Sequence, residues 1–442
     1  MTDWDDADVR DRIWDHISTA RWFSGKGRDG TLARLLPLAP VVDEHDLKVV
    51  PVIALVCYPQ APEEYYQLLL ALRPGSSAGL TQIHVDGDPM TQIHVDGDPI
   101  TVSDATTDQE ALTVWARTIL EADPQAADDS WQLHRRLEAP EPVRTAERFG
   151  GEQSNTSIMV GDAIIVKMFR RLEPGDNLDI TIHGALNDAG VSSVAKLYGH
   201  ISGQIPADED IQTDLAMIIE RLPHPQDGWE LITDKAADLE DVADLVADLG
   251  RCLRTIHSAL EQTLGTAELD GGQIADDMVR RLDAAVAAAP ALEPHRDLLA
   301  ARFEKLRGRR LAAQRVHGDF HLGQTLLTPD GWRIIDFEGE PLKTLAERRL
   351  PDSRWRDVAG MVRSLSYATS AHAEPTAPET LAWAQRARDA FLDGYGRPND
   401  AERDVLAAYE ADKAGYETVY ETLNRPAWVD IPLSAIRAMV QD

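Results

Sequence analysis

Three side chains within residues 314–340 have the types and spacing for metal-assisted chemistry. Asp319 lies in the polar turn HGDFH, Gln324 follows five residues later, and Asp336 ends the apolar run WRII. Pro-Asp-Gly at 329–331 separates two short β-favouring runs, which is typical of a hairpin. Because a hairpin brings its flanks together, we expect Asp319, Gln324 and Asp336 to meet at one end of it. Two carboxylates and an amide oxygen suit a hard cation and a catalytic base.

This pattern resembles the catalytic core of protein-kinase-like phosphotransferases. Those proteins carry an Asp base in a loop, an amide metal ligand about five residues on, and a metal-binding Asp after a hairpin. Here Asp319 matches the base, Gln324 stands where Asn is usual, and Asp336-Phe337-Glu338 stands where Asp-Phe-Gly is usual. The resemblance therefore implies Asp319 as the catalytic residue and Gln324 and Asp336 as ligands of Mg²⁺.

Two other interpretations of this stretch compete with phosphotransfer. A buried polar turn without chemistry would explain an isolated HGD, but HGDxHxxQ followed by IIDFE is a much more specific pattern. A hydrolase could instead use His317, Asp319 and His321 as metal ligands. No further histidine-rich cluster in the sequence completes a zinc site, so phosphotransfer is favoured.

Residues 143–172 have the features of a hairpin that covers nucleotide phosphates. The segment predicts a strand, a glycine-rich polar turn and two further strands, ending in AIIVKMFRR. Backbone N–H groups and small polar side chains at such a tip suit phosphate. The candidates at the tip are Gln153, Ser154, Asn155, Thr156 and Ser157. Lys167 in the last strand resembles the kinase lysine that holds the α and β phosphates, although an isolated strand lysine is usually only solvated.

The acidic partner that kinases usually provide for this lysine is missing from its expected position. Thr181 or Ile182 stands where the helix glutamate is sought, and the nearby carboxylates are Asp176 and Asp179. Two arrangements remain open. Either Asp336 and the phosphates orient Lys167, or the lysine pairs with a different acid.

Composition limits the classes of function. The chain has 442 residues, enough for two or three structural units, and a formal net charge of −31. Such acidity disfavours nucleic acid and an anionic membrane surface as partners. The N-terminus lacks the features of a signal peptide, and no apolar run is long enough to span a bilayer. Cys57 and Cys252 are isolated, as expected in a reducing compartment. We expect a soluble, cytoplasmic monomer or weak oligomer.

Hydrophobic periodicity predicts an α+β protein. Strands are expected within 30–75, near 191–204 and at 214–222. Helices are expected at 4–20, 106–138, 236–262, 275–312, 355–368, 377–395 and 402–425. The decapeptide TQIHVDGDPM at 81–90 is repeated as TQIHVDGDPI at 91–100. Because two copies do not make a solenoid, we expect this duplication to lengthen a hairpin or loop.

Several motifs together resemble the bacterial maltokinases, in the aminoglycoside-phosphotransferase-like branch of the kinase fold. These motifs are RWFSGKGR, EQSNTS, VHGDFHLGQ, IDFEGEP, ERRLPDSRWRDVAGMVRS and DKAGYETVYETLNRPAWVDIPL. The resemblance covers about residues 20–436 and implies a bilobal fold with ATP between the lobes. The implied divisions are an N-terminal cap at 1–100, an N-lobe at 101–222 and an α-helical C-lobe at 223–442.

The same resemblance implies roles for further residues. The strand at 214–222 would end at an interlobe linker, where Glu220, Arg221 and Leu222 are candidates to bind the adenine edge. Asp357, at the start of the helix 355–368, would brace the catalytic loop. The last helix and its exit would line the acceptor pocket, since carboxylates and aromatic rings commonly bind sugars. The acceptor candidates are His321, Lys413, Tyr416, Glu417, Tyr420, Glu421, Asn424, Arg425 and Trp428.

Departures from the maltokinase pattern favour the similar actinobacterial glucosamine kinases. Thr181 replaces an acid, and the tail reads NRPAWVDIPL. Asp319 with Glu417 or Glu421 could receive the ammonium group of an amino sugar. We expect glucosamine as acceptor, giving glucosamine 6-phosphate. Maltose, giving maltose 1-phosphate, is the first alternative and an aminoglycoside the second. A binding protein without turnover is also open, supported only by the missing glutamate.

Overall fold

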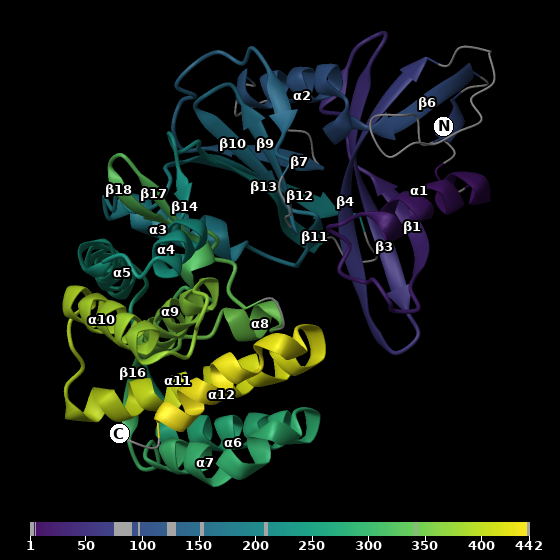
Figure 1. Cartoon of the computed structure of the whole chain (residues 1–442). Helices are drawn as coiled ribbons and strands as arrows, with labels where there is room; N and C mark the ends of the chain where they lie inside the picture. The colour runs from purple at the N-terminus through teal and green to yellow at the C-terminus, as the bar shows by residue number, and fades with distance from the viewer. Residues whose placement is uncertain are drawn as a thin grey trace. The chain divides into compact units, whose positions relative to one another are not determined.

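The computed structural model describes residues 4, 6–74, 91–95, 98–121, 130–150, 154–206, 211–340 and 343–439. The chain divides into two compact units (Figure 1). The first unit contains residues 1–180 and 196–222, and the second contains residues 181–195 and 223–442. Helix α3 (Leu178–Asp188) begins in the first unit and continues into the second.

The first unit begins with helix α1 (Ala7–Thr19) and an antiparallel sheet. Asp6 caps the helix by accepting hydrogen bonds from the backbone N–H groups of Asp8 and Val9, and Ile13 and Ile17 are buried as their spacing predicts. The sheet order is β1-β3-β4-β6-β5, with β2 on β3 and β11 on β4. The strands are β1 (Thr31–Pro37), β2 (Val42–Asp43), β3 (Lys48–Tyr58), β4 (Ala61–Pro74), β5 (Thr91–Val95), β6 (Asp98–Asp104) and β11 (Arg171–Leu172).

A second antiparallel sheet of the first unit carries the predicted phosphate-covering hairpin. Its order is β7-β12-β13-β10-β9-β8. The strands are β7 (Trp131–Arg135), β8 (Ala146–Arg148), β9 (Thr156–Val160), β10 (Ile164–Met168), β12 (Leu197–Ile205) and β13 (Ile211–Glu220). Helix α2 (Gln109–Glu121) follows the short 3₁₀ turn η1 (Ala105–Thr107). One hydrophobic core contains residues from both sheets and from α2.

Two sequence predictions in the first unit differ in their outcome. The helix predicted over 106–138 is correct for α2 but wrong at its end, because Trp131–Arg135 pairs with β12 as strand β7. Trp131 and Leu133 are buried in alternation, which is the period of a strand. The second copy of the duplicated decapeptide forms β5 and the start of β6, which pair as a hairpin. The first copy, 81–90, lies outside the described residues.

The second unit is mainly helical and carries the short hairpin β17–β18, drawn in green (Figure 1). Its helices are α4 (Gly228–Ala237), α5 (Ala243–Leu264), α6 (Gly271–Ala288), α7 (Arg296–Glu304), α8 (Leu345–Arg348), α9 (Trp355–Ala368), α10 (Pro378–Tyr395), α11 (Asp400–Asn424) and α12 (Asp430–Ala438). Its strands are β14 (Gln226–Asp227), β15 (Thr266–Asp270), β16 (Arg310–Gln314), β17 (Thr325–Thr328) and β18 (Gly331–Ile334). Its 3₁₀ turns are η2 (Pro290–His295), η3 (Leu322–Gln324), η4 (Thr369–Ala371) and η5 (Pro426–Trp428).

Two long helices predicted here are interrupted. The helix expected over 236–262 breaks between α4 and α5, where Leu239 has a positive φ of 54°. The helix expected over 275–312 ends at η2, which contains Pro290 and Pro294, and its last residues form β16. Proline removes a backbone donor and clashes with the preceding turn, so a continuous helix is not possible there.

Helices α5 and α10 cross at Gly250 and Gly394, so the backbones of the two helices approach each other closely. A Cβ atom at Gly250 would lie 2.3 Å from the carbonyl oxygen of Phe391, and one at Gly394 would lie 2.0 Å from that of Ala247. Neither position therefore admits a side chain. Helix α9 is buried along most of its length beside this crossing. Among the described residues, no helix has both the length and the apolar character needed to cross a membrane.

Candidate active site

The predicted catalytic loop, residues 317–324, is held by the carboxylate of Asp357. One oxygen of Asp357 accepts a hydrogen bond of 2.8 Å from the N–H of His317, and the other accepts one of 2.9 Å from the N–H of Gly318. Gly318 has a φ of 88°, a conformation that favours glycine. The bracing role predicted for Asp357 is thus confirmed. The loop is fixed through its main chain, just before Asp319.

Asp357 is buried, and its carboxylate also has a hydrogen-bond partner outside the loop, the side chain of His257. His257 Nε2 lies 2.9 Å from its Oδ2, while His257 Nδ1 lies 2.9 Å from the hydroxyl of Tyr395. Burial raises the pKa of the Asp357 carboxyl, but the hydrogen bonds from His257 and from the loop lower the pKa by more, so the net shift is downward. Asp357 therefore remains a carboxylate that accepts both backbone bonds.

Arg356 holds the other side of the same loop. Its Nε donates a hydrogen bond of 3.0 Å to the carbonyl oxygen of Gly318. One terminal nitrogen donates to Glu340 at 2.6 Å and the other to Asp352 at 3.2 Å. Because Glu340 lies just after the segment Asp336–Glu338, this guanidinium joins the catalytic loop to the segment that carries the second predicted metal ligand.

Asp319 is partly exposed and lies beside Lys413 of helix α11. The distance from Lys413 Nζ to Asp319 Oδ1 is 3.4 Å. Burial lowers the pKa of Lys413, but the carboxylates of Asp319 and Glu417 raise the pKa by more, so this lysine is held in its charged form. Burial lowers the pKa of His321, whose Nδ1 accepts the N–H of Gly323 at 3.1 Å. The neutral imidazole of His321 thus accepts a backbone hydrogen bond within the loop.

The hairpin brings the two predicted metal ligands together. Thr325 pairs with Ile334, so the residues flanking the two strands are neighbours. Gln324 Nε2 lies 3.4 Å from Asp336 Oδ2, and the N–H of Ile335 donates to the carbonyl oxygen of Gln324 at 3.1 Å. Asp336 has a φ of 66°, in the left-handed region that L-residues rarely adopt. An amide oxygen and a carboxylate form an all-oxygen donor set, which fits Mg²⁺.

Lys167 pairs with Asp179 in the first unit. Their side chains are joined by a hydrogen bond of 2.8 Å. Asp179 lies in the first turn of α3, where the Asn177 side-chain oxygen accepts its N–H at 2.8 Å. The acid therefore comes two residues before Thr181, where it was sought, because α3 already begins at Leu178. Of the two arrangements left open by the sequence, the structure shows the pair with a different acid.

The predicted hairpin tip is only partly open to a ligand. Ser154 is exposed, whereas Thr156 is buried and its hydroxyl accepts a hydrogen bond of 2.7 Å from Arg170 Nε. The side-chain oxygen of Asn155 accepts the N–H of Arg170 at 3.1 Å. Ser157 pairs with Lys167 across β9 and β10. Gln153 lies outside the described residues. Asn155 and Thr156 therefore hold the hairpin with their side chains.

The residues predicted to bind adenine lie where β13 ends. Glu220 accepts the N–H of Lys196 at 3.2 Å, and Leu222 is buried. Arg221 donates to the carbonyl oxygen of Gly161 at 2.6 Å, which ties the strand end to the β9–β10 turn. No contact here tests the role in adenine binding, which stays a prediction.

Helix α11 presents acidic side chains to helix α9. Arg363 donates two hydrogen bonds to Glu417 Oε2, at 2.9 and 2.7 Å. Glu421 is only 1% exposed; its Oε1 accepts from Arg425 at 2.7 Å. Its Oε2, like the hydroxyl of Tyr367, has no hydrogen-bond partner among the described residues. Lys413, Glu417 and Glu421 follow one another at four-residue spacing, so they share a face of the helix.

The aromatic residues predicted beside them are more exposed. Tyr416 and Tyr420 are 40% and 45% exposed. Lys413 Nζ lies 5.3 Å from the ring of Tyr416, and the guanidinium of Arg425 lies 5.3 Å from Tyr420 and 4.6 Å from Trp428. Asn424 is exposed and bonds to its own helix at the carbonyl of Tyr420. Glu421, predicted beside the polar stripe, is instead the most buried member of the set.

Several residues that position the candidate site were not predicted from the sequence. They are Arg170, His257, Arg356, Arg363 and Tyr367. Arg356 and Arg363 lie seven residues apart in helix α9, which is buried along most of its length, and this spacing is the signal that could have revealed them. A charged pair on the buried face of a helix requires carboxylate partners elsewhere in the chain.

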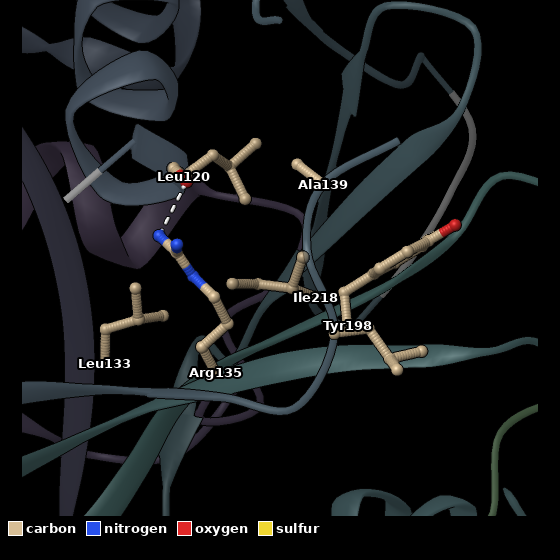
Figure 2. A pocket seen from close by; sticks show the side chains of 7 residues that line it. Leu120, Leu133, Arg135, Ala139, Tyr198 and Ile218 are labelled. Atoms are coloured by element: carbon tan, nitrogen blue, oxygen red, sulfur yellow. Dashed lines mark hydrogen bonds between the residues drawn. The ribbon is translucent and has the colours of Figure 1, made fainter. Parts of the chain in front are cut away.

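The first unit contains a small cavity that is lined by none of the predicted site residues; Figure 2 shows it from close by. It is lined by Leu120, Leu133, Arg135, Leu137, Ala139, Tyr198 and Ile218. Arg135 reaches across to the carbonyl oxygen of Leu120 at 2.8 Å, and the remaining space holds about one water molecule. Ile218 follows Met217, the cross-strand partner of Lys167, so the cavity lies on the opposite face of the sheet from Lys167.

The match to a family model identifies the family of this chain. Residues 145–409, which include both the hairpin and the catalytic loop, match the model of the phosphotransferase enzyme family. The chain belongs to this family. It is therefore a phosphotransferase, and its α+β kinase-like fold is as the sequence predicted.

Two relatives are known as glucosamine kinases. The one from Mycolicibacterium smegmatis is 28% identical over 317 residues, covering 66% of this chain and 78% of the relative. The one from Streptacidiphilus jiangxiensis is 28% identical over 355 residues, covering 68% and 77%. A solved structure of a glucosamine kinase in complex with glucosamine, ADP and inorganic phosphate has a TM-score of 0.68 and 20% identity, covering 96% of this chain and 98% of that one. This likeness shows that the fold extends over nearly the whole chain.

Proposed function

We propose that the protein transfers the γ-phosphoryl group of ATP to a hydroxyl group of glucosamine, giving glucosamine 6-phosphate. The observation that carries the choice of an amino sugar is the buried Glu421, whose Oε2 has no hydrogen-bond partner among the described residues. A buried carboxylate oxygen without a donor is costly, and an ammonium group would satisfy it. The similarity to two glucosamine kinases supports the same choice.

The residues of the second unit would carry the phosphoryl transfer. The acceptor hydroxyl oxygen attacks the γ-phosphorus, the bond from phosphorus to the β–γ bridging oxygen breaks, and its electron pair leaves with ADP. The hydroxyl proton passes to the carboxylate of Asp319, which the braced loop holds in place. Gln324 and Asp336 would hold Mg²⁺, which neutralises charge on the phosphates when bound.

The residues of the first unit would bind the nucleotide. The Lys167 ammonium, oriented by Asp179, would bind phosphate oxygens. Backbone N–H groups near Ser154 would cover the phosphates, and Glu220 and Leu222 would contact the adenine edge. The Lys167–Asp179 pair also removes the observation that favoured a binding protein without turnover, since that hypothesis depended on a missing acid.

Maltose remains the second candidate because of the exposed rings of Tyr416 and Tyr420. Exposed aromatic faces at a sugar site suit a larger, uncharged saccharide. An aminoglycoside, the third candidate, would use the acidic face of α11 in the same way as glucosamine.

Release of ADP in the presence of Mg-ATP tests the proposal. We expect turnover with glucosamine and little with maltose, glucose or an aminoglycoside. Asp319→Asn should lower kcat by about 10²- to 10⁴-fold, because it removes the general base while keeping the shape of the side chain. Glu421→Gln should raise KM for glucosamine by about tenfold, since it removes a charge-assisted hydrogen bond. Equal or better turnover with maltose, unaffected by Glu421→Gln, would overturn the choice of glucosamine.

A further inference from the structure

The ammonium of Lys413 is placed for a role beyond acceptor binding. Asp319 Oδ1, at 3.4 Å, is its one hydrogen-bond partner among the residues that the structure describes. A lysine ammonium has three N–H donors, so two remain for a ligand. The Lys413 side chain is 31% exposed, which leaves those donors accessible.

The position of Asp319 limits where a reacting phosphoryl group can lie. Lys413 occupies Asp319 Oδ1, so Oδ2 is the oxygen available to the acceptor hydroxyl. In a reactive arrangement the hydroxyl oxygen and the phosphorus are about 3–3.5 Å apart. A phosphoryl group that reacts with a hydroxyl bound at Asp319 Oδ2 therefore has its oxygens within hydrogen-bonding reach of Lys413, which lies at Oδ1 of the same carboxylate.

A positive charge at this place also affects where an amino sugar binds. An ammonium group bound at Asp319 would be repelled by Lys413, because both carry positive charge. Arg363 already donates twice to Glu417 Oε2, which makes this carboxylate a weaker receptor for a second cation. Lys413 is thus poorly suited to receiving the ammonium and well suited to receiving phosphate.

We propose that Lys413 is a catalytic residue that binds a nonbridging oxygen of the γ-phosphoryl group during transfer. The acceptor oxygen forms its bond to phosphorus, the bond to the bridging oxygen breaks with its electron pair leaving on the nucleoside diphosphate, and the hydroxyl proton goes to Asp319. Lys413 keeps its proton throughout and stabilises the charge on the transferring group. This inference rests on the proposed phosphotransfer, but it does not depend on which sugar is the acceptor.

The first test compares Lys413→Met and Lys413→Arg with the control Lys305→Met. Lys305 donates to Asp404 at 3.1 Å, so the control removes another lysine–aspartate pair of the same unit. We expect Lys413→Met to lower kcat by about 10²- to 10³-fold, the usual effect of losing one transition-state donor. KM for the nucleotide should stay within about threefold, Lys413→Arg should recover part of kcat, and the control should match the wild type.

Two readouts separate this role from one of merely positioning Asp319. If Lys413 contacts the γ-phosphoryl oxygens, Lys413→Met should reduce the preference for ATP over ATPγS. It should also weaken the combined binding of ADP and aluminium fluoride, a mimic of the transferring group, while leaving binding of ADP alone unchanged. Lower kcat with an unchanged preference and unchanged fluoride binding would overturn the proposal.

The binding readout keeps this inference distinct from the choice of substrate. If glucosamine is not an acceptor, the ADP and aluminium fluoride measurement still reports on Lys413, because it needs no turnover. Loss of fluoride binding in Lys413→Met would then support the role of Lys413 while the proposed acceptor fails. Thermal unfolding of each variant shows whether the fold is kept, and Lys413→Arg supplies the comparison if Lys413→Met unfolds.

Discussion

Two buried charges of opposite sign hold the two functional loops, one in each unit. Asp357 holds the predicted catalytic loop in the second unit, and Arg170 holds the hairpin that is predicted to cover phosphates in the first. Asp357 binds main-chain N–H groups, whereas the Arg170 guanidinium binds the hydroxyls of Thr156 and Thr106 and the carbonyl of Gln67. The difference decides which side chains remain free for chemistry.

A loop fixed through its main chain leaves its side chains available. Asp319 and Gln324 can therefore meet substrate and metal while Asp357 keeps their backbone in place. In the hairpin, by contrast, Asn155 and Thr156 use their side chains to hold Arg170. A polar motif that looks like a set of phosphate ligands thus divides into residues that hold the loop and residues, such as Ser154, that can meet a ligand.

The environments of the two charges differ as well. Burial lowers the pKa of Arg170 to about 10, and the nearby Asp104 opposes that shift. The guanidinium also lies 4.7 Å from the ring of Trp22, in the motif RWFSGKGR. Asp357 has a lowered pKa because its hydrogen bonds outweigh its burial. The hydrogen bonds of Asp357 thus outweigh the cost of burying its charge, whereas the burial of the Arg170 charge is not fully offset.

Asp357→Asn should have the largest effect. An asparagine can accept the N–H of His317 or of Gly318 at its oxygen, but its NH₂ group then faces the other N–H. We expect the free energy of unfolding to fall by about 3 kcal/mol, because buried donors lose their acceptor. We also expect kcat to fall by about 10²-fold as Asp319 moves from its position. Urea unfolding and steady-state kinetics measure both effects.

The matched control for this variant is Asp283→Asn, which alters an exposed pair with Arg296. Its free energy of unfolding should stay within about 0.5 kcal/mol of the wild type. If Asp357→Asn kept normal kcat, the catalytic loop would not depend on this brace.

Arg170→Met should have a smaller and different effect. The substitution removes the hydrogen bonds to Thr156, Thr106 and Gln67 but also removes a costly buried charge, so we expect a loss of about 2 kcal/mol in the free energy of unfolding. Because the hairpin is predicted to cover phosphates, KM for the nucleotide should rise by about tenfold while KM for the acceptor stays constant. Arg171→Met, which alters an exposed arginine next in sequence, is the control. A change in kcat alone would contradict the assigned role of the hairpin.

Local signals explain which features the sequence could predict. The hairpin β17–β18 follows from a turn sequence between two β-favouring runs, so the proximity of Gln324 and Asp336 could be predicted. Arg170 and Arg363 were missed because their partners are distant in sequence. Arg170 binds Thr106, 64 residues away, and Arg363 binds Glu417, 54 residues away. Such pairs form only when the fold brings separate elements together.

The boundaries of elements show the same dependence on tertiary structure. Trp131 fits the end of a helix by local pattern, but pairing with β12 makes it part of a strand. Asp179 was named as a nearby carboxylate, yet its pairing with Lys167 depends on where α3 begins. Local propensity is a weak guide at such boundaries, since packing and pairing decide them.

The titration of His200 in the first unit should have a smaller effect on stability than either Asp357→Asn or Arg170→Met. His200 lies on β12, and its ring is stacked on that of His134 at a centroid distance of 4.4 Å. Its Nε2 is 3.7 Å from Asp214, which also accepts the N–H of Asn177 just before α3. Burial, with a further contribution from His134, lowers the pKa of His200 to about 4. The folded state therefore keeps this imidazole neutral at pH values where the unfolded chain takes up a proton.

The sign follows from this difference in proton uptake. His200 favours folding at neutral pH, and this contribution is lost as the pH falls from about 6.5 to about 4. Between pH 7 and pH 5 we expect a loss of about 1 kcal/mol that is absent in His200→Gln, since the ring is partly exposed. Urea unfolding at both pH values measures it, with exposed His45→Gln as the control. Asp357 should not share this dependence, because its lowered pKa keeps it ionised over the same range. An identical pH dependence in the wild type and His200→Gln would show that the lowered pKa of His200 does not contribute to stability.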